Sequence, residues 1–164
     1  MRIWICGAVA LLCAVGLSGT AAAAKKPKPF HETATTCAKY VSPAWVQKET
    51  GVVGAPQKGP AGQCHFIVNG VRDAFQVGIH NMGTQKKALA LLQQAWKGLA
   101  SDSSSTGTWV TGLGTKAFVL DGPLNGAYVV RGDEFFDLQW FAPIALTHDQ
   151  STAVLKALLA KVPK

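Results

Sequence analysis

Alternation between apolar and polar residues constrains this chain more than any other feature of its sequence. Within residues 74–80 (AFQVGIH) every second residue is large and apolar, and residues 64–68 (CHFIV) repeat this spacing. A period of two with one apolar face is typical of a half-buried β-strand. The intervening Asn69-Gly70 pair is a strong signal for a hairpin turn. A tight turn there would put Asp73 on the core side, so we expect a bulge or a longer loop.

The C-terminal half repeats the strand signal several times. Four further strands are expected, at residues 109–111, 117–120, 126–131 and 134–141. In the last of them Phe136, Leu138 and Trp140 share one face. Asp137 and Gln139 point to the other face, because successive side chains of a strand alternate. The short connections between these strands favour hairpins and therefore an antiparallel sheet.

Three amphipathic segments supply helices to cover this sheet. Residues 42–51 begin with a Ser-Pro capping pair and end in glycine. Thr84 can cap a helix over residues 85–100, in which the apolar residues follow helical spacing. Residues 147–150 (THDQ) form a capping-box pattern that opens the last helix. We therefore predict an α+β domain with a mainly antiparallel sheet of five to six strands and three helices, in the order α-β-β-α-β-β-β-β-α.

The first 24 residues have the three parts of a secretory signal peptide. Arg2 supplies the early positive charge, an apolar run without acids follows, and a stretch of alanines predicts cleavage near Ala23 or Ala24. The apolar run is shorter than the roughly 20 residues that a membrane-spanning helix needs. We expect residues 25–35 to be a disordered leader rich in Lys and Pro, and residues 36–164 to form one domain. These features predict a periplasmic or secreted protein with no membrane span after cleavage.

Two cysteines remain outside the predicted signal peptide, Cys37 and Cys64. In an oxidising compartment an isolated pair is first interpreted as a disulfide bond. Such a bond would stabilise the fold by roughly 3–4 kcal/mol, because it restricts the unfolded chain. The alternative is a pair of buried free thiols.

The formal net charge is +7, and one of these positive charges is lost with Arg2 if the signal peptide is removed. A basic surface can attract anionic partners such as a cell-wall polymer. The lysines are scattered over the tail, the helical segments and the C-terminus, however, and scattered lysines are typical of solvated faces. We expect no nucleic-acid partner.

Residues 112–117 (GLGTKA) fit the loose form of the dinucleotide-binding fingerprint, G-x-G-x-x-[GA]. That fingerprint works only where a helix follows it, because the helix N-terminus holds the pyrophosphate. Here the next residues read as a strand, so the glycines are better explained by a sharp bend between strands. The sequence therefore predicts no cofactor.

His31, Cys37, Cys64 and His65 are residue types that can bind zinc. Cys64 and His65 are neighbours on a predicted strand and project to opposite faces. Structural zinc sites space their ligands several residues apart. We therefore expect no metal site.

Candidate ligand or partner contacts are His65, Gln76 and His80 on the outer face of the sheet, together with Trp109 after a flexible loop. A histidine can act in acid–base catalysis, yet neither G-x-S-x-G nor H-E-x-x-H is present, so we predict no catalytic residue.

The chain has one acidic cluster, formed by Asp133, Glu134 and Asp137. It could bind a cation or a basic partner. A turn recruits Asp, however, and calcium sites need a loop rich in oxygen ligands. We interpret the cluster as surface.

The order of these motifs is similar to that of a known group of domains. Cys37 precedes a short helix that ends at Gly51, and a second cysteine follows in residues 63–66 (QCHF). Residues 110–117 (VTGLGTKA), a strand, the turn at 131–133 (RGD), a further strand and a final helix complete the pattern. The chain resembles small exported bacterial domains of unknown function, many of them lipoproteins, with a PsbP-like α-β-α sandwich. Unlike many of them, it lacks a lipid-attachment cysteine. The resemblance implies a non-enzymatic envelope module and transfers no catalytic residue.

The leading hypothesis is a non-catalytic periplasmic or secreted binding module, for example an accessory protein or inhibitor that binds another envelope protein. One alternative is a small periplasmic hydrolase that uses His65 or His80. The other is a binder of anionic cell-wall polymer.

Overall fold

The computed structural model describes residues 34–99 and 104–163. The predicted signal peptide and most of the predicted leader lie outside the described residues. The helices and strands are α1 (Ala34–Tyr40), α2 (Pro43–Thr50), β1 (Ala55–Gln57), β2 (Gln63–Val68), β3 (Val71–Asn81), α3 (Gln85–Leu99), β4 (Thr106–Val110), β5 (Lys116–Asp121), β6 (Asn125–Arg131), β7 (Glu134–Trp140) and α4 (His148–Lys161). No helix in this part of the chain is long and apolar enough to cross a membrane.

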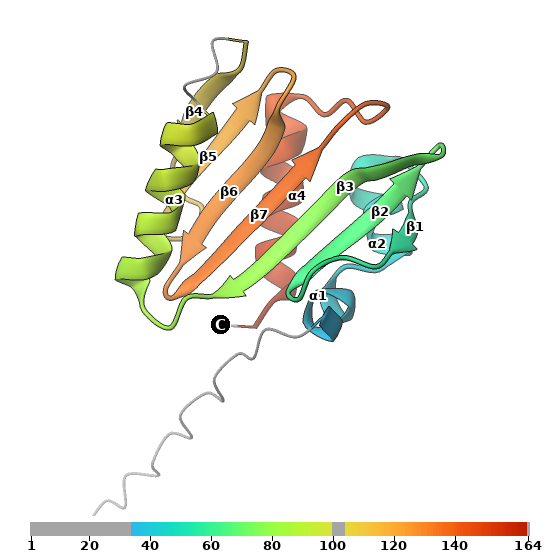
Figure 1. Cartoon of the computed structure of the whole chain (residues 1–164). Helices are drawn as coiled ribbons and strands as arrows, with labels where there is room; N and C mark the ends of the chain where they lie inside the picture. The colour runs from blue at the N-terminus through green and yellow to red at the C-terminus, as the bar shows by residue number, and fades with distance from the viewer. Residues whose placement is uncertain (1–33, 100–103, 164) are drawn as a thin grey trace, which may run out of the picture.

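The strands form one antiparallel sheet in the order β1-β2-β3-β7-β6-β5-β4, with helices on both faces (Figure 1). The predicted α+β class is confirmed. The described residues contain seven strands and four helices, one strand and one helix more than the upper prediction. The extra strand, β1, lies in the segment 54–62, which its Gly and Pro content made look like a loop. The extra helix, α1, begins two residues before the predicted start of the domain, and its sequence ATTCAKY has no apolar periodicity.

The hairpin between β2 and β3 contains the expected irregularity. Asn69 and Gly70 both have positive φ, of 50° and 79°, as a two-residue turn requires. The register then shifts, so that Phe66 pairs with Phe75. Asp73, which has a φ of 57°, is the residue that the bulge displaces from the core. The predicted bulge is therefore confirmed.

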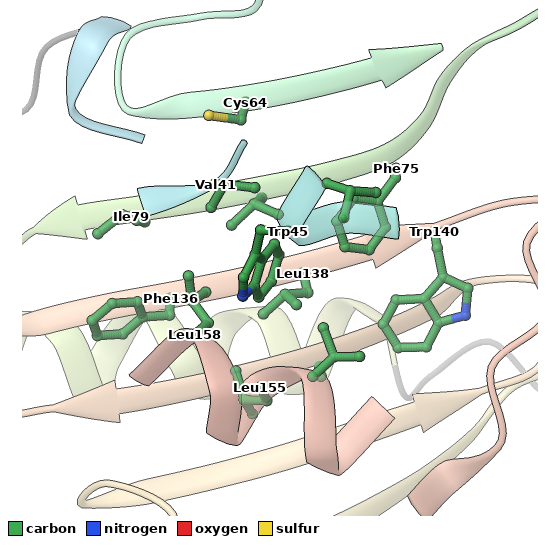
Figure 2. Close-up of a cluster of buried hydrophobic side chains, with 14 of the residues drawn as sticks. Val41, Trp45, Cys64, Phe75, Ile79, Phe136, Leu138, Trp140, Leu155 and Leu158 are labelled. Carbon is green, nitrogen blue, oxygen red and sulfur yellow. The ribbon is translucent and has the colours of Figure 1, made fainter. Parts of the chain in front are cut away.

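The larger core lies between the sheet and α1, α2 and α4 (Figure 2). Ser42 caps α2, since its side chain accepts a hydrogen bond from the backbone N–H of Trp45, and Trp45 is buried against the sheet. A disulfide joins Cys37 of α1 to Cys64 of β2, with 5.6 Å between their Cα atoms. The capping box predicted for the last helix is present at the start of α4. Leu155 of that helix is fully buried.

A smaller core lies on the opposite face, under α3. It is rich in aromatic rings, and Phe118 and Tyr128 are stacked with their centroids 4.6 Å apart. Trp96 of α3 lies against Trp109 of β4 at a centroid separation of 4.5 Å. Helix α3 thus covers β5, β6 and the adjoining part of β7 on this face.

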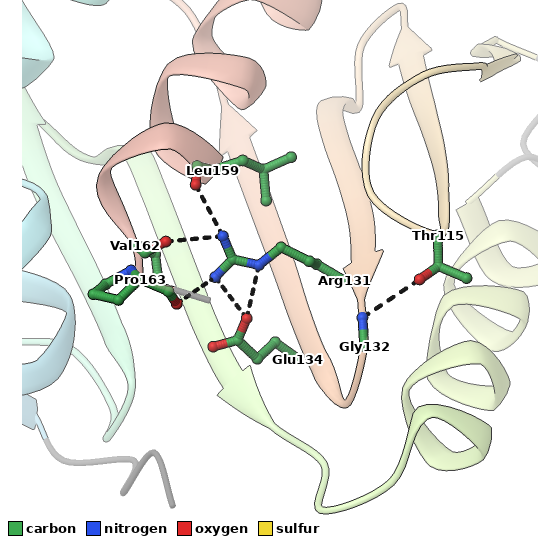
Figure 3. A network of polar contacts seen from close by, with 7 residues as sticks. All are labelled: Thr115, Arg131, Gly132, Glu134, Leu159, Val162 and Pro163. Carbon is green, nitrogen blue, oxygen red and sulfur yellow. Dashed lines mark hydrogen bonds and ion pairs between the residues drawn. The ribbon is translucent and has the colours of Figure 1, made fainter. Parts of the chain in front are cut away.

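Arg131, at the end of β6, ties the C-terminal end of α4 to the sheet (Figure 3). Its guanidinium donates two hydrogen bonds to Oε2 of Glu134, at 2.7 and 2.9 Å. It also donates to the backbone carbonyls of Leu159, Val162 and Pro163, at 2.8–2.9 Å. A cation at this position is favourable because the carbonyls at a helix C-terminus carry partial negative charge.

Candidate recognition site on the sheet

Cross-strand pairing arranges the side chains of the α3 face in rows that run across the sheet. The central row consists of Trp109, Phe118, Tyr128, Asp137, Gly78 and Gln63. The next row consists of Gly107, Leu120, Gly126, Gln139, Gln76, His65 and Gln57. In both rows the large residues of β5 and β6 are apolar or aromatic, and polar residues take over at β7. The polar face, as we call it, consists of Gln57, Gln63, His65, Asp73, Gln76, His80, Asp137 and Gln139.

One hydrogen-bonded group of the polar face is centred on His65. Its Nδ1 lies 2.6 Å from Oδ1 of Asp73, and its Nε2 lies 3.0 Å from Oε1 of Gln63. Gln57 donates a further hydrogen bond to the same carboxylate oxygen of Asp73 at 2.9 Å. Both ring nitrogens of His65 are therefore engaged, and no hydroxyl or thiol is among their partners. This arrangement fixes the imidazole in place.

A second group joins His80 of β3 to Asp137 of β7. His80 Nε2 lies 3.1 Å from Oδ1 of Asp137, and Gln139 donates to the other carboxylate oxygen at 3.5 Å. Only 18% of the His80 side chain and 11% of the Asp137 side chain are exposed. Gly78 makes room for this pair, because a Cβ atom there would overlap the Asp137 carboxylate and crowd the His80 ring.

Tyr128 stands at the boundary between the aromatic core and the polar face. It pairs directly with Asp137 across β6 and β7 and is buried. Burial, followed by the negative charge of Asp137, raises the pKa of the Tyr128 phenol well above its ordinary value. The phenol therefore keeps its proton to a higher pH than an exposed tyrosine does.

The structure brings three of the four predicted contact residues together. His65 and Gln76 are direct cross-strand partners, and His80 lies on the same face of β3. Trp109 lies on this face too, but at the opposite edge of the sheet. Its ring packs against Trp96, and Lys116 Nζ lies 4.2 Å from its centroid, although 36% of Trp109 remains exposed.

The prediction of an acidic surface cluster is wrong. Glu134 and Asp137 are both buried and lie on opposite faces of the sheet, where they pair with Arg131 and His80. Asp133 alone is exposed, in the turn. Each buried acid has acquired a basic partner, as buried carboxylates generally do.

The sequence reasoning missed five members of the site, which are Gln57, Gln63, Asp73, Asp137 and Gln139. Strand alternation placed the last two on the correct face, but their neighbours on β3 come from a distant segment. A cavity of about 360 Å³ adjoins the polar face. It lies between the α1–α2 corner and the β1–β2 edge, with His65, Lys58 and Pro43 in its lining.

Within the described ranges, no group of three or more His, Cys, Asp or Glu side chains could hold a metal ion. Residues 112–117 lead into β5, as predicted, and no helix follows them directly. No protein-family model matches this chain, and no curated protein matches it. The resemblance to PsbP-like domains therefore stays a prediction.

Proposed function

We propose that this chain is a non-catalytic binding module that works in the periplasm or as a secreted protein, with the polar face as its recognition surface. The observation that supports it is the pair of half-buried histidine–aspartate groups on the part of the sheet that α3 leaves uncovered. The disulfide between Cys37 and Cys64 is compatible with an oxidising compartment.

The energetics of the polar face favour recognition over a purely structural role. Half-buried polar groups lose hydration, and their hydrogen bonds to one another only offset that loss. Apolar residues on β2 and β3 under another helix would stabilise a sheet more simply. Side chains that are already held by neighbours lose little conformational entropy when a partner docks. The amides of Gln63, Gln76 and Gln139 supply both donors and acceptors to such a partner.

The charges of the polar face indicate which partner fits. Each of its two carboxylates is paired with an imidazole, and no Lys or Arg belongs to it. A partner that presents neutral hydrogen-bonding groups, such as the backbone and amide side chains of another envelope protein, matches this surface. A polyanion does not match it and would have to bind the scattered lysines elsewhere.

The test is site-specific photo-crosslinking in intact cells. A photoreactive amino acid replaces Gln76 on the polar face or, as the matched control, Gln94 on the exposed side of α3. We expect one adduct of defined mass from position 76 and none from position 94. A probe at position 63 should give an adduct with the same partner in the otherwise unchanged protein. The Gln76→Ala/Gln139→Ala double variant should lose that adduct from position 63 while keeping its circular dichroism spectrum. Equal labelling at 76 and 94, or none at either, would contradict the proposal.

A small hydrolase is the second candidate, and the His80–Asp137 pair is the observation that favours it. A carboxylate that orients an imidazole is a recurring element of acid–base catalysis. Turnover of generic ester or amide substrates that disappears in His80→Gln, but persists in His65→Gln, would support this candidate over the binding module. No turnover by the wild-type protein would remove it.

A further inference from the structure

The two edges of the sheet differ in how they are protected. β1 is three residues long and contains Pro56, which has no N–H to offer a further strand. Lys58 follows it directly. β4, at the other edge, is five residues long, with the sequence TGTWV, and contains neither a charge nor a proline. Natural edge strands are usually short or carry a charge or a proline, because an unprotected edge pairs readily with another strand.

The open edge of β4 is accessible in the part of the chain that the structure describes. β4 pairs with β5 on one side and is the last strand of the sheet. Thr106, Thr108 and Trp109 are exposed. Trp109 is also one of three exposed large hydrophobic residues among the described residues.

The sequence of β4 is complementary to itself in the antiparallel direction. A two-fold axis through Thr108 places that residue opposite its own copy and Thr106 opposite Val110. Gly107 then lies opposite Trp109, and both are on the α3 face of the sheet. Gly107 has no side chain to clash with Trp109 of the facing strand, and a glycine opposite an aromatic residue is a favourable cross-strand pair. Two copies of one residue can face each other across a two-fold axis either as a hydrogen-bonded pair or as a non-hydrogen-bonded pair of antiparallel strands.

We propose that two copies of this chain pair through their β4 strands and form one continuous antiparallel sheet. The contact is isologous, since the same residues contribute from both copies. The axis is perpendicular to the sheet, so both α3 helices and both polar faces lie on the same side. The polar faces lie at the far ends of the joined sheet, because β1–β3 and β4 are at opposite edges. The dimer therefore presents two recognition surfaces that point in one direction.

Charge substitution at the axis tests this register. In Thr108→Lys two like charges would face each other across the axis, and the same holds for Thr108→Glu. Thr108 is exposed, so neither change disturbs the monomer. Thr111→Lys makes the same chemical change at an exposed position just beyond the strand and serves as the matched control. Each protein is expressed with its predicted signal peptide and purified after cleavage. Sedimentation velocity then measures its oligomeric state over a range of concentrations.

We expect the wild type and Thr111→Lys to be dimeric at high concentration and both Thr108 variants to be monomeric. An equimolar mixture of Thr108→Lys and Thr108→Glu should restore a dimer with one copy of each, because opposite charges then meet at the axis. A wild type that stays monomeric at every concentration would overturn the proposal. So would a dimer that tolerates Thr108→Lys, or a mixture that stays monomeric. Circular dichroism of each variant separates loss of pairing from loss of fold.

Discussion

The two halves of the α3 face of the sheet have the same backbone pattern and opposite chemistry. On β4, β5 and β6 the central row carries Trp109, Phe118 and Tyr128. Helix α3 covers Phe118 and Tyr128, and its Trp96 packs against one side of Trp109. On β7 the same row continues with Asp137, and no described helix lies over the polar residues of β2 and β3. The change occurs between two directly paired residues, Tyr128 and Asp137. The reach of one helix therefore decides where the sheet must be apolar and where it can carry polar residues.

The largest effect on stability is expected when a buried side chain is truncated in the half of the sheet that α3 covers. Phe118→Ala removes a fully buried ring that packs against Trp96, Trp109 and Tyr128, and should cost about 3–5 kcal/mol of unfolding free energy. Gln76→Ala, in the open half, should change it by less than about 0.5 kcal/mol. Urea denaturation measures both. Similar losses in the two variants would mean that the halves do not differ energetically.

The next largest effect is expected from the disulfide, which lies under the half of the sheet that α3 leaves open. The Cys37→Ser/Cys64→Ser variant opens a loop with a sequence separation of 27 residues and should lose about 3–4 kcal/mol. Strong reductant should lower the melting temperature of the wild type in the same way and leave the variant unaffected. An identical melting curve with and without reductant would contradict the disulfide.

A smaller loss is expected at the boundary between the halves. Gly78→Ala forces a methyl group into the Asp137 carboxylate and should cost about 1–3 kcal/mol. In an Asp137→Ala background the same change should cost much less, because the obstructing group is gone. A double-mutant cycle measures this coupling. Equal costs in the two backgrounds would show that Gly78 is not required to make room for Asp137.

The smallest effect appears only in alkali. The folded state keeps the proton on Tyr128, whose pKa is raised by burial, while an unfolded tyrosine loses its proton near pH 10. The contribution of Tyr128 to the free energy of unfolding is therefore fully present below pH about 10. As the pH rises above that value, the free energy of unfolding falls by up to about 1.4 kcal/mol per pH unit. Tyr128→Phe should flatten this slope in urea denaturation at a series of alkaline pH values. Equal slopes for Tyr128→Phe and wild type would contradict the assignment.

Local patterns were sufficient to predict most of the fold. The capping residues Ser42 and Thr147 and the turn at Asn69-Gly70 act within a few residues of chain, so their signals are visible in the sequence. β1 was missed because its segment is rich in Gly and Pro, and only its partner β2 makes it a strand. Short strands depend on tertiary pairing more than on their own composition.

The candidate site was less predictable. Alternation placed His65, Gln76 and His80 on one face, and the strand register puts the three side chains on the same face of the sheet. It could not show that β7 inserts beside β3, so the pairing of His80 with Asp137, 57 residues apart, was not foreseen. The burial of Asp137 depends on the missing side chain of Gly78 as well, which is a property of two strands together.

The Arg131 bridge couples the last turn of α4 to the turn between β6 and β7. When residues 159–163 leave the sheet, the guanidinium of Arg131 keeps Glu134 as a partner but loses its three carbonyl acceptors together. The end of α4 is therefore expected to detach as one unit rather than to fray residue by residue, because a single side chain holds all three carbonyls.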